Sequence, residues 1–144
     1  MINEKDVIRM RIPFPSVDQT LAVRSHMYIC RSSAHPKYGF VKCQTLKPYM
    51  LSSSSFRHYV DEEADITRNP FSHATRIDCD KLFTTSSVQY DDSMKTPIRP
   101  NVCQELYDRI RIELAADGYW ECPLNDDEMV LINPSTHKIS ITRV

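Results

Sequence analysis

The sequence predicts a small, mainly β fold with some helix: an antiparallel barrel, one helix in the C-terminal half and an extra terminal hairpin. Short runs of β-branched and aromatic residues recur along the chain, turn residues separate them, and one long stretch has apolar residues at helical spacing. With 144 residues, 41% hydrophobic and 26% charged, the chain can bury a real core. We expect one domain over residues 1–144, with a core at about 5–117 and a C-terminal extension at 118–144.

Three strands are expected in the first third of the chain. Residues 7–14 alternate partly and run into a proline-containing loop, and residues 26–30 and 40–46 are mostly apolar. A turn that contains Gly39, one of only two glycines, separates the last two runs. We therefore expect these two runs to pair as a hairpin.

The remaining chain is expected to hold a long loop, one strand, one helix and the final hairpin. Residues 47–72 are polar and irregular, which predicts a loop, and residues 74–85 are typical of a strand. Residues 101–118 predict the helix, because apolar residues recur at helical spacing after a capping residue, Asn101. Residues 129–144 surround the turn-forming string NPST and predict the hairpin.

Composition argues against several classes of protein. No apolar run approaches the roughly 20 residues of a membrane helix, and the first residues lack the apolar segment of a signal peptide, so we expect a cytoplasmic location. The five cysteines are widely spaced without a C-x-x-C pair, which argues against disulfides and structural zinc. Two glycines leave no glycine-rich phosphate loop. We expect neither a metal nor a cofactor.

Charge is divided unevenly along the chain. Residues 1–60 carry nine Lys and Arg against three acids, a net charge of +6, whereas residues 61–144 carry −7, although the whole chain carries only −1. A basic N-terminal half is typical of a surface that binds a polyanion. A solvated surface with no ligand would also fit this division.

The hairpin would bring Arg24 and Thr45 to the same open end. A guanidinium and a hydroxyl together can bind a phosphodiester and stabilise the charge that develops on it. Lys42 and Lys47 lie nearby in the sequence and could attract a nucleic acid. Alternatively, Arg24 pairs with Asp18 in its own loop and Thr45 only ends a strand.

Several segments together resemble one family. These are KDVIRMRIPFP, DQTLAVRSHMYIC, FVKCQTL, IDCDKLFTTSS and NVCQELYDRIRIEL, over roughly residues 5–115. In this order and spacing they are similar to the strands and the C-terminal helix of the MazF/PemK (Kid) toxin endoribonucleases. The resemblance implies an SH3-like barrel, a homodimer, and a hydrolase of a toxin–antitoxin pair that cuts single-stranded RNA sequence-specifically without a metal.

The resemblance also implies a mechanism, a partner and a site. The 2′-hydroxyl of the RNA attacks the adjacent phosphate and leaves a 2′,3′-cyclic phosphate, and a cognate antitoxin covers the RNA groove with an acidic extended segment. Arg24 and Thr45 take the catalytic positions, Arg24 to stabilise charge and Thr45 to hydrogen-bond the phosphate. The substrate-binding positions are His26, Lys42, Gln44, Lys47 and Asp80.

The chain departs from the family pattern at several positions. Ser25 stands where a proline follows the arginine, Leu46 replaces a small residue, and Asp78 stands where some members carry a basic residue. His26 or His73 could supply proton transfer, because an imidazole titrates near neutral pH. The alternatives are a non-catalytic barrel that binds RNA or a protein partner, and an unrelated β-barrel interaction module.

Overall fold

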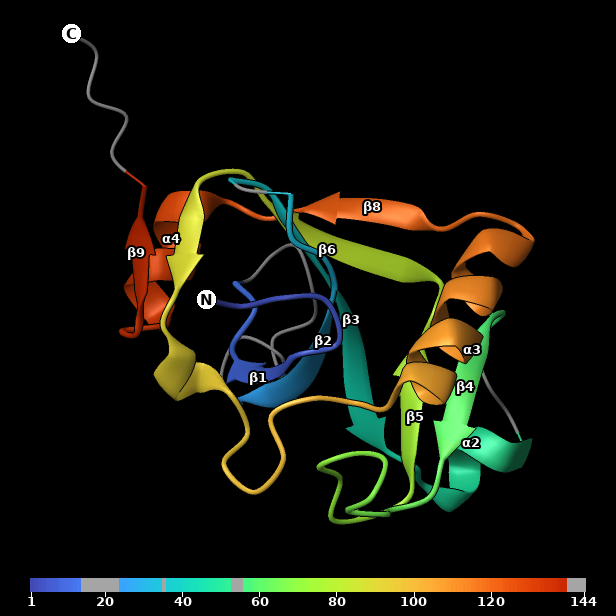
Figure 1. The fold of residues 1–144 in the computed structure, drawn as a ribbon. Helices are drawn as coiled ribbons and strands as arrows, with labels where there is room; N and C mark the ends of the chain where they lie inside the picture. The colour runs from blue at the N-terminus through green and yellow to red at the C-terminus, as the bar shows by residue number, and fades with distance from the viewer. Residues whose placement is uncertain (14–23, 35, 53–55, 140–144) are drawn as a thin grey trace, which may run out of the picture.

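One large, mostly antiparallel sheet dominates the computed structural model, which describes residues 1–13, 24–34, 36–52 and 56–139 (Figure 1). Its strands are β1 (Val7–Met10), β2 (His26–Ser32), β3 (Tyr38–Thr45), β4 (Tyr59–Glu62), β5 (Thr75–Asp78), β6 (Lys81–Thr85) and β8 (Trp120–Pro123). A separate ribbon pairs β7 (Val88–Tyr90) with β9 (Thr136–Lys138). The helical elements are α2 (Pro48–Ser52), the 3-10 helix η1 (Asp92–Met94), α3 (Gln104–Ala116) and α4 (Asp126–Ile132).

The expected hairpin of the second and third strands is confirmed. Met27 lies opposite Cys43 and Tyr28 opposite Lys42, in an antiparallel register. The register shifts near the turn, where Ser32 lies opposite Gly39. A Cβ atom at Gly39 would come within 2.5 Å of the Ser32 Oγ, so the absence of a side chain permits this close approach of the two strands.

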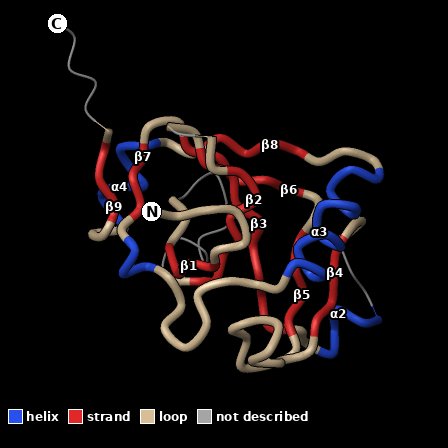
Figure 2. The backbone as a smooth tube through the Cα atoms, viewed as in Figure 1, coloured by secondary structure: helices blue, strands red, loops and turns tan. Residues whose placement is uncertain are grey.

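The sheet divides at β3 and does not close into a barrel. Along one edge of β3, β5 pairs with residues 43–45 and β6 pairs with residues 38–40. The strand order is β1-β2-β3-β5-β4, and β8 extends the second branch by a parallel pairing with β6 (Figure 2). Within the described residues, β1 pairs with neither β4 nor β8. The fold is therefore mainly β with some helix, as expected, but the sheet is open and is not a closed barrel.

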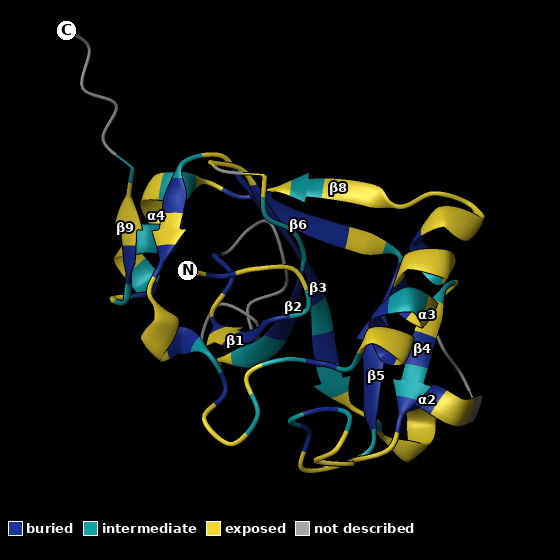
Figure 3. Ribbon diagram, in the orientation of Figure 1, coloured by how far each residue is buried: buried dark blue, intermediate teal, exposed yellow. Residues whose placement is uncertain are grey.

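The two faces of the sheet are covered by different cores. One face packs its apolar residues against α3, through Leu106, Tyr107, Ile110 and Leu114. The other face carries an aromatic core that α4 and the β7–β9 ribbon help to cover. Figure 1 places α3 beside β4 and β5, with α4 and the ribbon at the opposite end of the molecule. Figure 3 shows the resulting buried strands between largely exposed helix surfaces.

Two expected elements are interrupted by local structure. Residues 74–85 form two strands, β5 and β6, because the chain turns at Cys79 and Asp80. The Asp80 N–H donates to the Asp78 carboxylate at 2.8 Å, and this bond replaces a strand pairing. Residues 47–72, expected as a loop, contain both α2 and β4.

The C-terminal extension contains a helix in place of the expected hairpin. The Asn125 side chain accepts from the Glu128 N–H at 3.0 Å and caps α4, whose first turn is acidic. β9 follows and pairs with β7, and β8 joins the main sheet. The other expected helix is present but begins at Gln104 with Cys103 as its N-cap residue, because Asn101 forms a bridge with Asp6.

No helix among residues 1–13, 24–34, 36–52 and 56–139 is long and apolar enough to cross a membrane.

Candidate functional site

A pocket of about 160 Å³ opens where β2 begins and β3 ends. It is lined by Arg9, Ser25, His26, Met27, Cys43, Gln44, Thr45, Phe71, Ser72, His73 and Thr75. These residues come from four strands, from Ser25 just before β2 and from the loop that precedes β5. The pocket is thus built by segments that are far apart in the sequence.

The strand register explains why these side chains meet. Arg9 of β1 lies opposite Met27 of β2, and Met27 lies opposite Cys43 of β3. Thr45, two residues further along β3, lies opposite Thr75 of β5. Directly paired residues project to the same face of a sheet, as do residues two apart in one strand. Arg9 and Thr45 therefore border the pocket from the same face.

The pocket has an apolar floor and a polar rim. Cys43 is 3% exposed and Phe71 is 7% exposed, whereas Arg9, Thr45 and His73 are exposed. Burial raises the pKa of the Cys43 thiol, so this sulfur is uncharged at neutral pH and is not an activated nucleophile. The arrangement suits a ligand with an anionic group at the rim and a less polar part inside.

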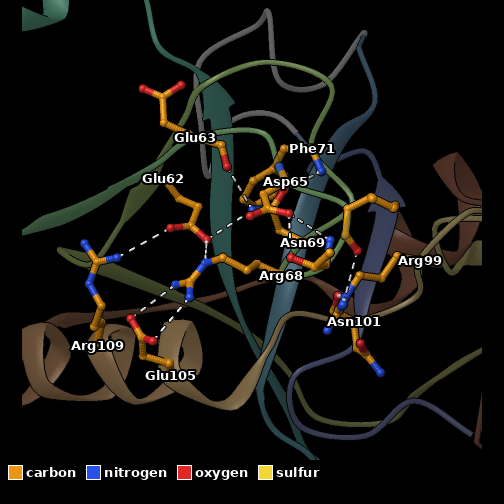
Figure 4. Close-up of polar contacts among 12 residues, drawn as sticks. Glu62, Glu63, Asp65, Arg68, Asn69, Phe71, Arg99, Asn101, Glu105 and Arg109 are labelled. Atoms are coloured by element: carbon orange, nitrogen blue, oxygen red, sulfur yellow. Dashed lines mark hydrogen bonds and ion pairs between the residues drawn. The ribbon is translucent and has the colours of Figure 1, made fainter.

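Asn69 holds the loop that carries Phe71 (Figure 4), and the same loop continues to His73. This side chain is fully buried. Its Nδ2 donates to the Glu62 Oε2 at 3.1 Å and to the Glu63 carbonyl at 3.0 Å. Its Oδ1 accepts from the Phe71 N–H at 3.0 Å. One amide therefore closes the loop between β4 and the pocket.

Glu62, the last residue of β4, connects this loop to α3 (Figure 4). The Arg68 Nε donates to the Glu62 Oε2 at 2.9 Å, and the Arg109 Nη1 lies 3.5 Å from the Glu62 Oε1. Arg68 also contacts both carboxylate oxygens of Glu105, in the first turn of α3, at 3.3 and 3.4 Å. Glu62 pairs with Thr75, the first residue of β5. The ion pairs of Glu62 therefore stabilise the start of β5 beside the pocket.

Three exposed cations that line the pocket or lie close in sequence to its lining residues have no carboxylate partner among the described residues. Arg9 lines the pocket, Arg24 precedes Ser25, and Lys47 lies two residues beyond Thr45. All three cations are exposed, and none forms an ion pair within the described part of the chain. Other Lys and Arg side chains do form ion pairs, among them Arg31, Lys37, Arg68, Arg76, Lys95, Arg109, Arg111 and Lys138. Positive charge beside the pocket favours an anionic ligand.

Several residues expected at the site come together. Thr45, His26 and Gln44 all line the pocket. Arg24 is exposed just outside it, and its carbonyl oxygen lies 3.2 Å from the His26 Nδ1. Its alternative partner Asp18 lies outside the described residues. Arg24 therefore adjoins the pocket but does not line it.

The other expected substrate-binding residues lie away from the pocket lining. Lys42 pairs with Tyr28 on the sheet face opposite to that of Thr45, and Lys47 is exposed beyond the end of β3. Asp80 lies just after Asp78, at the opposite end of β5 from Thr75. Its carboxylate accepts from the backbone N–H groups of Arg57 and His58 at 2.8 and 3.0 Å, which is a structural contact.

Sequence reasoning missed Arg9 and, apart from His73, the Phe71–Thr75 side of the pocket. The partial alternation of residues 7–14 was visible, but it does not reveal which strand lies beside Arg9. Phe71 belongs to a polar, proline-containing stretch with no periodic pattern. Its place depends on contacts with distant residues, above all Asn69 and Glu62.

His58 joins the end of α3 to the start of β4 and makes stability pH-dependent. Its Nδ1 lies 3.3 Å from the Glu113 carboxylate and its Nε2 lies 2.8 Å from the Asp117 carboxylate. The hydrogen bond with Glu113 raises the pKa of His58 most, partial burial opposes this rise, and Asp117 adds to it. The stabilisation is full below the unfolded pKa near 6.5 and is lost as pH rises through the higher folded pKa.

We therefore expect His58→Gln to have a lower urea midpoint of unfolding than the wild type at pH 5.5. At pH 8.5 the two midpoints should be nearly equal. Urea midpoints at several pH values measure this difference, and His137→Gln, an exposed histidine on β9, is the matched control. A difference in urea midpoint between the wild type and His58→Gln that stays constant with pH would contradict the link between His58 protonation and stability.

The described residues contain no group of three or more His, Cys, Asp and Glu side chains placed to hold a metal ion. Comparison of the chain with models of protein families, with curated proteins and with solved structures finds no match.

Proposed function

We propose that this chain is a metal-independent endoribonuclease that cuts single-stranded RNA sequence-specifically, with the pocket at the start of β2 and the end of β3 as its active site. One observation carries the proposal: Arg9, Thr45 and His73 line one pocket, and Arg9 and the neighbouring Arg24 form no ion pair within the described residues. These are the groups that transfer of a phosphodiester to its own 2′-hydroxyl requires. The reaction would leave a 2′,3′-cyclic phosphate and a 5′-hydroxyl.

Each rim residue has a role in this proposal. Arg9 contacts the scissile phosphate and stabilises the charge that grows on its oxygens, because a guanidinium offers two parallel donors. The Thr45 hydroxyl donates to a second oxygen. Arg24, just outside the lining, binds the neighbouring phosphate or moves inward when RNA is bound. The Phe71 and Cys43 floor accepts the less polar part of a nucleotide.

The proposal extends to the fold and the partners. We propose that the open sheet is a distorted SH3-like barrel, which the β2–β3 hairpin and the packing of α3 on one face support. We also propose a toxin role, as a homodimer whose antitoxin places an acidic extended segment over Arg9, Arg24 and Lys47. The absence of carboxylate partners for these cations among the described residues supports an acidic ligand.

Removal of Arg9 tests the activity. We expect Arg9→Ala and Arg24→Ala each to lower cleavage of mixed-sequence single-stranded RNA by about 100-fold, because each removes a donor to a charged phosphate. The measurement is gel-resolved cleavage in EDTA, with the ends identified by mass spectrometry. Arg57→Ala is the matched control, because Arg57 is an exposed arginine outside this pocket.

A wild-type protein that folds but leaves RNA intact under these conditions would contradict the proposal. The second candidate is then a module that binds RNA without cutting it. The position of Arg24 outside the pocket lining favours that candidate. RNA binding that falls for Arg9→Ala but not for Arg57→Ala, without cleavage by any variant, would establish it.

A further inference from the structure

The chain just after β1 keeps the alternation of that strand. Ile8, Met10 and Ile12 all belong to the aromatic core on one face of the sheet. Arg9 and Arg11, which alternate with them, are exposed. Successive residues of an extended chain point to opposite faces of a sheet. Arg11 therefore lies on the same side as Arg9, the arginine that lines the pocket.

Arg11 also lies beside the pocket in the direction of β2. Met10 pairs with His26, and β1 and β2 are antiparallel, so the chain beyond Met10 runs alongside the chain before His26. The residue before His26 is Ser25, which lines the pocket. No acid forms an ion pair with Arg11 among residues 1–13, 24–34, 36–52 and 56–139. A second guanidinium without a carboxylate partner thus lies next to that of Arg9.

A buried amide from the C-terminal extension holds the backbone of Arg11. Asn133 follows α4 and is 5% exposed. Its Oδ1 accepts from the Arg11 N–H at 2.8 Å, and its Nδ2 donates to the Arg11 carbonyl at 2.9 Å. The same Nδ2 donates to the Met129 carbonyl of α4 at 3.0 Å. These contacts satisfy both backbone groups of Arg11 at the point where the strand pairing of β1 has ended.

We propose that Arg11 is a further phosphate-binding residue of the RNA site and that Asn133 is its positioning residue, an inference that rests on the proposed function. Two residues along an extended strand span roughly 6.6 Å, and successive phosphates of an extended RNA chain are a similar distance apart. Arg9 contacts the scissile phosphate, and Arg11 donates a charge-assisted hydrogen bond to a phosphate further along the chain. Such a contact adds affinity without base preference.

The first experiment measures binding without cleavage. The probe is a 2′-O-methyl oligonucleotide of mixed sequence, which cannot react because its 2′-oxygen carries no proton. Fluorescence anisotropy at several salt concentrations gives Kd for the wild type, Arg11→Gln, Arg11→Lys and the control Arg57→Gln. Arg57 is an exposed arginine that lines a different pocket.

We expect Arg11→Gln to raise Kd about five-fold, the scale of one exposed charge pair. The slope of log K against log salt should become shallower by about 0.7, the contribution of one phosphate contact with a single strand. Arg11→Lys should keep the wild-type slope because it keeps the charge, and the control should match the wild type. A wild-type Kd and slope for Arg11→Gln would overturn the inference.

A double-variant cycle tests the positioning role of Asn133. Asn133→Leu removes both hydrogen bonds to the Arg11 backbone, so it should raise Kd for the probe when Arg11 is present. In the Arg11→Gln background the same substitution should leave Kd unchanged, because it acts through Arg11. Equal losses of affinity in both backgrounds would show that Asn133 only supports the fold, and would overturn its positioning role.

A measurement on the wild type makes the test independent of whether the variants fold. Addition of the probe should shift the ¹⁵Nε resonance of Arg11 and leave that of Arg57 in place, and an unchanged Arg11 resonance overturns the inference. If the wild type cuts RNA while Arg11→Gln binds the probe as the wild type does, the Arg11 contact is wrong and the endoribonuclease stands.

If the wild type binds the probe but does not cut RNA, the endoribonuclease falls, and the Kd and slope of Arg11→Gln still decide the contact. If the wild type neither binds the probe nor cuts RNA, both fall.

Discussion

Replacement of Arg76 by Met is expected to lower the free energy of unfolding by about 3 kcal/mol, because it leaves a carboxylate in the sheet without its partner. Arg76 is 1% exposed, yet its guanidinium is held by both Asp61 oxygens at 2.8 and 2.9 Å. Its Nη1 also donates to the Met50 carbonyl at 3.0 Å. The Tyr59 ring lies 3.7 Å from its guanidinium carbon, a cation–π contact.

The predicted loss of stability is at the low end of the range for removal of one partner of a buried ion pair. The reason is that Asp61 is 34% exposed, so water screens its charge. Urea unfolding at neutral pH measures the change, and Arg57→Met, which replaces an exposed arginine, should stay within about 0.5 kcal/mol of the wild type. The double variant Arg76→Met with Asp61→Leu should recover part of the loss, because it leaves no unpaired charge. A loss below about 1 kcal/mol for Arg76→Met would show that the pair contributes little.

Replacement of Asn69 by Leu is expected to cost about 3 kcal/mol of stability and to lower any activity of the pocket. Leucine has a similar size but no polar atoms. It therefore leaves the Phe71 N–H and the Glu63 carbonyl without the partners at 3.0 Å that Asn69 provides, and it removes a donor to Glu62. Buried polar groups that lose their partners pay the full cost of leaving water.

The loop that Asn69 closes also carries His73, so its loosening should be measurable at the pocket. Hydrogen exchange should show faster exchange of the Phe71 amide, and urea unfolding should show the loss of stability. Gln89→Leu is the matched control, because Gln89 is an exposed amide on β7 and its replacement should leave both unchanged. Wild-type exchange at Phe71 in Asn69→Leu would contradict the assigned role of this side chain.

Local patterns were sufficient for the elements whose stability depends on neighbouring residues. The β2–β3 hairpin follows from two alternating runs on either side of the Gly39 turn, and its register placed His26, Gln44 and Thr45 near one another. Apolar residues at helical spacing predicted α3, whose Leu106, Ile110 and Leu114 are indeed buried. Each of these signals lies within one segment or two adjacent segments.

Elements that depend on single side-chain contacts were placed wrongly or only in part. The Asp78–Asp80 contact divides the strand expected at residues 74–85, and this division lets β5 and β6 pair with different parts of β3. Asn125 before three acidic residues is a helix-start pattern, whereas the NPST string that follows predicts a hairpin turn. Competing local signals of similar strength are decided by tertiary packing.

The sequence alone determined that this protein has a basic N-terminal half, a central hairpin that presents Thr45 and His26, and one long amphipathic helix. Only the tertiary structure decided that Arg9 and His73 border the same pocket as Thr45. The reason is physical. Arg9 reaches Thr45 through the register of three strands, and His73 reaches it through a loop that the buried Asn69 amide and the Glu62 carboxylate hold in place. Such contacts connect residues far apart in the chain, and no short pattern records them.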